Sequence, residues 1–155
     1  MSSKGIIYIP FDHLHRNYGA LKKAEPNSHV IAMVESARMT TGRDWHPQRL
    51  HFLISSARHF AKSLRDEGFE VIYLKSPTTI DGLREIQRSH LGAISCAEPS
   101  SFLQYQQLKD FGVEFVTNDL FLTTRKDFFL WAEKQKSYLM ENFYRAQRVR
   151  LNILV

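Results

Sequence analysis

Five short apolar segments recur along the chain and predict the strands of a buried sheet. Each is rich in β-branched or aromatic residues and is followed by polar or turn-forming residues. They span residues 5–10, 29–34, 69–74, 93–97 and 113–117. Because their apolar character is nearly continuous, they are typical of strands that are covered on both faces.

Apolar residues at helical spacing fill the longest gap between these strands. They recur every three or four positions, as on one face of an amphipathic helix. They are Leu50, Leu53, Ile54, Ala57, Phe60, Ala61 and Leu64. This pattern predicts a helix that ends at Gly68.

Capping residues ahead of further apolar stripes predict four more helices. A Ser or Thr hydroxyl that accepts from the backbone three residues on is a common helix start. The expected starts and stripes are Thr78 and Asp81 with Leu83, Ile86 and Leu91; Ser100 or Ser101 with Leu103, Leu108 and Phe111, ending at Gly112; Thr124 with Asp127; and residues 138–148 for the last helix.

Strands that alternate with helices predict a Rossmann-like α/β sandwich of three layers. We expect a five-stranded parallel sheet in the order 3-2-1-4-5, with helices on both faces. A chain of 155 residues favours a single domain, residues 1–155. The longest irregular segments, residues 12–28 and 35–46, follow the first two strands.

Ligands of such sheets bind beyond the carboxyl ends of the strands, where the strand order reverses. This rule selects Phe11 and Asp12 after the first strand, Glu35 after the second and Glu98 after the fourth. The predicted crevice lies between the first and fourth strands, flanked by Asp12 and Glu98. Alternatives stay open for these residues. Asp12 and Glu35 are ligand-binding carboxylates, or they are solvated loop carboxylates or helix caps. Phe11 and Leu50 are apolar walls of the site, or they belong to the core or its edge.

Several chemistries are excluded by the motifs. No glycine occurs between Phe11 and Gly19, so the G-x-G-x-x-G turn and the Walker loop are absent after the first strand. The histidines lack the spacing of three or four residues that suits a helical pair of metal ligands. Cys96 falls inside a predicted buried strand, where a cysteine packs as a small apolar residue. We therefore predict no catalytic residue and no metal site.

The charge of the chain is concentrated at its C-terminal end. The net charge is +5, from 21 basic and 16 acidic residues, and residues 134–155 hold five basic residues against Glu141 alone. This stripe is either a solvated helix face or a contact for phosphate or an acidic partner. The same end is dense in aromatic residues, which indicates a partner surface.

No apolar run is long enough to span a membrane and no secretory signal is present, so we expect a cytoplasmic protein without membrane contact.

Several short motifs resemble those of a known family. They are Met33-Val-Glu35, Arg58-His-Phe-Ala61, Glu98-Pro99, Trp131-Ala132, Met140-Glu-Asn-Phe-Tyr-Arg145 and Arg148. The chain resembles, over essentially its whole length, the N-terminal domain of the photolyase-related proteins. These are the bacterial cryptochromes and (6-4) photolyases that carry an iron-sulfur cluster.

The resemblance implies an α/β domain that holds a lumazine antenna of the 6,7-dimethyl-8-ribityllumazine type. Matched positions imply that Asp12, Glu35 and Leu50 contact this chromophore. The family has glycine where this chain has Phe11, so we expect a narrower crevice. FAD and the cluster belong to a helical C-terminal region that we expect this chain to lack.

The leading hypothesis is therefore an antenna-type domain of a DNA repair or photoreceptor protein. The parent family resembles deoxyribodipyrimidine photolyase lyases, but we expect this chain alone to be inactive. Phe143, Tyr144, Arg145 and Arg148 are predicted to dock on the helical region or on a second copy, with only weak DNA binding. The alternative is a stand-alone Rossmann-like module that binds a small molecule or nucleotide and acts by binding or oligomerisation.

Overall fold

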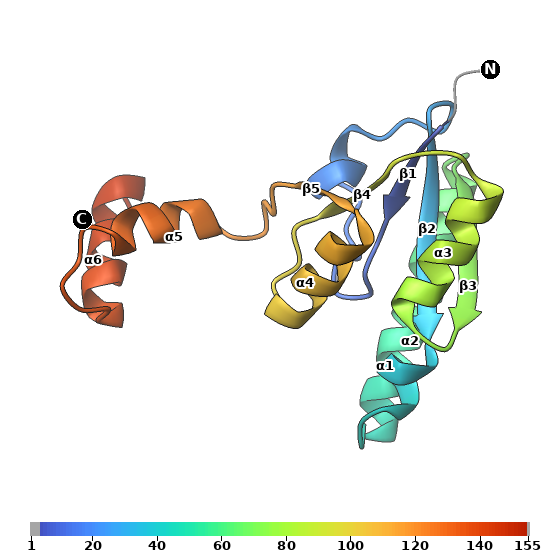
Figure 1. Cartoon of the computed structure of the whole chain (residues 1–155), viewed down its shortest axis with the longest axis horizontal. Helices are drawn as coiled ribbons and strands as arrows, with labels where there is room; N and C mark the ends of the chain where they lie inside the picture. The colour runs from blue at the N-terminus through green and yellow to red at the C-terminus, as the bar shows by residue number, and fades with distance from the viewer. Residues whose placement is uncertain (1–3, 155) are drawn as a thin grey trace. The chain divides into compact units, whose positions relative to one another are not determined.

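The computed structural model describes residues 4–154 and divides into two compact units, Met1–Asn118 and Asp119–Val155. The first is an α/β unit built on a five-stranded parallel sheet in the order β3-β2-β1-β4-β5 (Figure 1). The strands are β1 (Gly5–Tyr8), β2 (His29–Ser36), β3 (Glu70–Ser76), β4 (Ile94–Ala97) and β5 (Glu114–Val116). The predicted strands and their order are confirmed, whereas a single domain over the whole chain stays a prediction.

Helices cover both faces of the sheet and complete the predicted three layers. They are the 3-10 helix η1 (Gly19–Lys23), and the α-helices α1 (Ala37–Thr41), α2 (Pro47–Asp66), α3 (Thr79–Ser89) and α4 (Phe102–Phe111). One apolar cluster joins the sheet to α2 and η1, through residues such as Ala57, Leu64 and Leu21. A second joins the opposite face to α3 and α4, through Leu83 and Leu108.

The alternation of side chains along each strand explains why the strands are apolar on both faces. In β1, Ile7 packs with the α2 cluster, whereas Ile6 packs with the α3 and α4 cluster. In β2, Ile31 and Ala32 divide in the same way. Successive residues of a strand point to opposite faces, so a sheet between two helical layers needs apolar residues at nearly every position.

Two segments expected to be irregular contain short helices. Residues 12–28 include η1, and residues 35–46 include the end of β2 and all of α1. The Ser36 hydroxyl accepts from the backbone N–H of Met39 at 3.2 Å and so caps α1. A helix of five residues is little more than one turn, too short to show a helical period.

Two leucines of the predicted apolar stripes are exposed in the structure. Leu91 is 84% exposed because α3 ends at Ser89, so Leu91 lies beyond the helix and outside its apolar face. Leu103 is 62% exposed in α4, where Leu108 alone is buried. The helix starts are correct, since Thr78 and Ser101 accept from the backbone N–H groups of Asp81 and Gln104.

The described part of the C-terminal unit, residues 119–154, contains the helices α5 (Arg125–Ala132) and α6 (Met140–Leu151). Thr124 and Asp127 form the predicted capping box at the start of α5: each side chain accepts from the other's backbone N–H. The last helix begins and ends within three residues of the predicted bounds. Within residues 4–154, no helix is long and apolar enough to cross a membrane.

Candidate functional site

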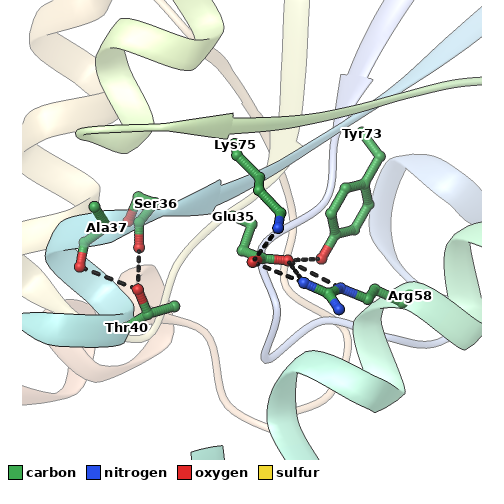
Figure 2. Close-up of polar contacts among 7 residues, drawn as sticks. All are labelled: Glu35, Ser36, Ala37, Thr40, Arg58, Tyr73 and Lys75. Carbon is green, nitrogen blue, oxygen red and sulfur yellow. Dashed lines mark hydrogen bonds and ion pairs between the residues drawn. The ribbon is translucent and has the colours of Figure 1, made fainter. Parts of the chain in front are cut away.

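The carboxylate of Glu35 is the centre of a polar cluster at the carboxyl end of β2 (Figure 2). The Arg58 guanidinium donates from Nε to Oε2 at 3.1 Å and from Nη2 to both carboxylate oxygens at 2.9 Å. The Tyr73 hydroxyl donates to Oε2 at 2.8 Å, and Lys75 Nζ lies 3.8 Å from Oε1. With its side chain only 10% exposed, Glu35 is an ion-paired anion and not a solvated loop residue.

Strand register and helix packing bring these side chains together. Glu35 is the direct partner of Lys75 in the pairing of β2 with β3, and Met33 is the partner of Tyr73. Alternate residues of a strand share a face, so all of them lie on the side of the sheet that α2 covers. Arg58 follows the buried Ala57 in α2 and reaches Glu35 from there.

The contacts of the cluster stabilise the protonated forms of its donors. The hydrogen bond to Glu35 raises the pKa of Arg58 above its ordinary value. Burial, followed by the hydrogen bond to Glu35, raises the pKa of Tyr73 to about 12. At neutral pH the phenol is therefore protonated and the guanidinium is charged, and both donate to the carboxylate.

Aromatic stacking joins the end of β1 to this cluster. Phe11 is buried, and its ring stacks on Tyr73 with the centroids 6.0 Å apart and the planes 26° apart. Asp12 follows it with a side chain that is 59% exposed, so its carboxylate faces solvent. Leu50 is half-buried in the first turn of α2.

Glu98, the remaining predicted site residue, lies elsewhere on the carboxyl edge. It follows β4, and β1 separates β4 from β2 in the sheet. Its backbone N–H donates to Val116 O at 2.9 Å, and its carbonyl accepts from Asn118 Nδ2 at 2.8 Å. The structure therefore joins Phe11 and Glu35 through Tyr73 and places Glu98 on the far side of β1.

A sequence model of the family described as "Deoxyribodipyrimidine photo-lyase-related protein" matches residues 7–155. This chain belongs to the photolyase-related family. A curated relative, the (6-4) photolyase of Agrobacterium fabrum (strain C58 / ATCC 33970), is 26% identical over 163 aligned positions. The alignment covers 97% of the photolyase-related chain and 32% of the relative, so the chain spans about a third of that protein's length.

Sequence reasoning missed the partners of Glu35 in the photolyase-related chain. The sequence predicts Tyr73 in the third strand and Arg58 in a motif like that of the family, and neither residue falls at the predicted binding edge. One signal was available: Tyr73 and Lys75 alternate along the third strand, as Met33 and Glu35 do along the second. Pairing the two strands in register places these residues on one face, although the sequence does not show which helix residue reaches them.

We expect the free energy of unfolding to fall at high pH, where the Tyr73 hydroxyl loses its proton. The folded state holds this proton more tightly than the unfolded chain, because its pKa rises from 10.0 to about 12. The stability linked to this proton is fully present below pH 10.0 and is lost as the pH rises through about 12. Urea unfolding across this range, in wild type and in Tyr73→Phe, measures it. The wild type should lose more stability with rising pH than the variant. If the unfolding free energies of the two proteins change with pH in parallel, folding does not raise the pKa of Tyr73.

The predicted interface residue Phe143 packs against aromatic rings inside the C-terminal unit. Its ring centroid lies 4.9 Å from that of Trp131 and 5.2 Å from that of Phe128, both in edge-to-face geometry. Such pairs contribute about 0.5–1.5 kcal/mol beyond their buried area. Phe143 therefore holds α6 against α5.

The other predicted interface residues lie on the surface of α6. Tyr144 is 53% exposed, and the Arg148 guanidinium lies 5.7 Å from its ring centroid. Arg145 donates to Glu141, one turn earlier, at 2.7 Å. These arginines are therefore held by neighbours on their own helix.

Many other apolar side chains of the C-terminal unit are also exposed. Among the described residues 119–154, only Ala132 is buried. Large apolar side chains that are at least half exposed are Leu120, Phe121, Leu122, Phe129, Leu130, Tyr138, Leu139, Met140, Tyr144, Val149 and Leu154. So many exposed large apolar side chains in one short unit are typical of a contact with another protein surface.

Proposed function

We propose that this chain is the antenna-chromophore-binding N-terminal domain of a photolyase-related DNA repair protein or cryptochrome, and that it is not catalytic alone. The observation that carries the proposal is the cluster of Phe11, Tyr73 and Glu35 at the carboxyl edge of the sheet. In open α/β sheets this edge is where ligands bind. The family match supports the assignment of the ligand as a light-absorbing chromophore.

The residues of this edge fit a lumazine. The donors of Arg58 and Tyr73 crowd Oε2, which accepts three hydrogen bonds, whereas Oε1 accepts one and keeps a second lone-pair site. Lys75 is too far from Oε1 for a hydrogen bond, so this oxygen can accept one more donor. Asp12 offers an exposed carboxylate, and Phe11 offers an apolar ring.

Each residue then has a defined task toward the chromophore. Arg58 and Tyr73 orient the Glu35 carboxylate, which accepts from an N–H or O–H of the ligand. Phe11 and Leu50 supply apolar contact, and Asp12 accepts from a polar arm. When bound, the lumazine supplies light absorption.

In this proposal, the residues of this chain take no part in the electron transfer that repairs DNA. Light-driven repair requires a bound flavin, and the protein's part is to position that cofactor. The family resemblance assigns FAD and the iron-sulfur cluster to a helical region. We therefore propose that the chain repairs no lesion alone and binds DNA only weakly through its basic C-terminal stripe.

The helical region of the parent protein is the proposed partner of the C-terminal unit. The exposed apolar side chains of α5 and α6 would pack on it, with Arg145 and Arg148 at the polar rim. A contact of this kind has an apolar centre and a polar edge. In the isolated chain, the same surface is expected to drive self-association through a second copy.

Titration of the purified chain with 6,7-dimethyl-8-ribityllumazine tests the proposal. We expect saturable binding with one site per chain, followed by the fluorescence of the lumazine. A parallel titration with FMN tests the stand-alone nucleotide-binding module. Saturable binding of FMN without binding of the lumazine would replace the antenna assignment by that module.

A further inference from the structure

His13 is buried without a hydrogen bond to either ring nitrogen. Its side chain is 4% exposed, and Nδ1 and Nε2 have no partner among the described residues 4–154. The nearest carboxylate oxygen, Oδ1 of Asp12, lies 4.0 Å from Nε2, which is beyond hydrogen-bond distance. Leaving a buried polar group unpaired costs about 1–3 kcal/mol. The orphaned imidazole therefore points to a group that the chain itself does not supply.

The imidazole lines a small cavity at the carboxyl ends of β1 and β4. The other walls are the tyrosines Tyr8 and Tyr18 and apolar residues that include Ile9, Pro10, Leu21 and Ala97. The Tyr18 ring packs edge-on against the imidazole, with the centroids 5.1 Å apart. The cavity volume is about 10 Å³, which leaves room for one water-sized group. The backbone N–H of His13 donates to Pro10 O at 2.9 Å, and this turn holds the ring against the cavity.

The position of the cavity connects it with the candidate site. β1 and β4 are the neighbours between which the strand order reverses, the place where α/β sheets bind ligands. Phe11 and Asp12 lie in the same turn, between Pro10 and His13. A ligand that rests on Phe11 and contacts Asp12 thus borders the cavity.

The chemistry of the cavity favours a neutral hydroxyl. Burial lowers the pKa of His13 below its ordinary value, although Asp12 opposes this shift. A neutral imidazole offers one N–H donor and one lone-pair acceptor. A hydroxyl both accepts and donates, so it can satisfy one nitrogen in either role. A carboxylate or phosphate is larger than the cavity, and a neutral imidazole does not offset its charge.

We propose that this cavity is a hydroxyl-binding subsite in which His13 holds one hydroxyl of a polyol chain on the ligand. The inference rests on the proposed function, since it takes the ligand at the carboxyl edge as its source of the polyol. For a ribityllumazine, that polyol is the ribityl chain, and the ring lies beside Phe11. A buried water is the other source of the same hydroxyl chemistry.

Two lumazines that differ only in the polyol test the subsite. The wild type should bind 6,7-dimethyl-8-ribityllumazine about 10-fold more tightly than 6,7,8-trimethyllumazine, which carries no hydroxyl chain. His13→Phe keeps an aromatic ring but removes both nitrogens, so this preference should disappear while the affinity for trimethyllumazine is unchanged. His13→Gln restores a donor and an acceptor and should recover part of the preference. A preference that persists in His13→Phe, or is absent from the wild type, would overturn the proposal.

Nitrogen NMR of the His13 ring provides a readout that requires no variant to fold. The ring ¹⁵N signals of the wild type should shift with the ribityl ligand and stay unchanged with the trimethyl ligand. Free ribitol separates this inference from the proposed function. If neither lumazine binds but ribitol shifts the His13 signals saturably, the subsite stands and the antenna assignment falls. If ribitol also leaves the signals unchanged, the cavity holds only water and the inference fails.

Discussion

Leu64→Ala should lower the free energy of unfolding of the α/β unit by about 2–5 kcal/mol, the usual cost of a leucine-to-alanine cavity in a core. Leu64 is fully buried on α2 and packs with Ile31 and Met33 in one apolar cluster. Loss of the Leu64 side chain weakens the packing of α2, the helix that carries Arg58. Urea unfolding followed by far-ultraviolet circular dichroism measures the change in the free energy of unfolding.

Leu103→Ala is the matched control for this cavity, because it deletes the same atoms from a leucine that is 62% exposed on α4. We expect its unfolding free energy to stay within about 0.5 kcal/mol of the wild type. Equal losses in the two variants would mean that α2 does not pack on the sheet through Leu64.

Phe143→Ser should separate α6 from α5 while the α/β unit stays folded. The variant removes the ring that contacts both Trp131 and Phe128 and leaves a hydroxyl in its place. Fewer than about 40 residues rarely fold without further support, so this unit has little stability to lose. The contribution of Trp131 to the near-ultraviolet circular dichroism should fall, and proteolysis should cut within residues 119–155.

Phe129→Ser distinguishes internal packing from contact with a partner. Phe129 is 62% exposed, so its loss should preserve the tryptophan signal. We expect weaker self-association than in the wild type when sedimentation is measured at several concentrations. A wild type that stays monomeric at all concentrations would show that the exposed apolar surface does not pair with a second copy.

The elements that the sequence predicted well are those whose burial pattern extends over several turns or a whole strand. Along α2, buried Ala57, Ala61 and Leu64 repeat at helical spacing, so the pattern itself reports the packing. α1 has no buried residue, and its start depends on a single hydrogen bond to Ser36. Leu103 shows the limit of apolar patterns, since a leucine beside a helix cap fits the stripe and still faces solvent.

The candidate site was predictable only in part, for a similar reason. The rule for parallel sheets selects Asp12 and Glu35 because it depends on strand ends, which the sequence shows. The ion pair of Glu35 with Arg58 joins residues 23 positions apart on different elements, and only the packing of α2 determines it. The burial of His13 was missed for the same reason, because the turn after β1 gives no periodic signal.

The lumazine titration of Glu35→Ala tests the central claim most directly, with Glu85→Ala as its control. Glu85 is an exposed carboxylate on α3, the helix on the opposite face of the sheet. Loss of the Glu35 acceptor should weaken binding by about 1–3 kcal/mol, the cost of leaving a buried polar partner unsatisfied. The account predicts this loss for Glu35→Ala and wild-type affinity for Glu85→Ala. Equal affinity of Glu35→Ala and the wild type, with both proteins folded, would contradict it.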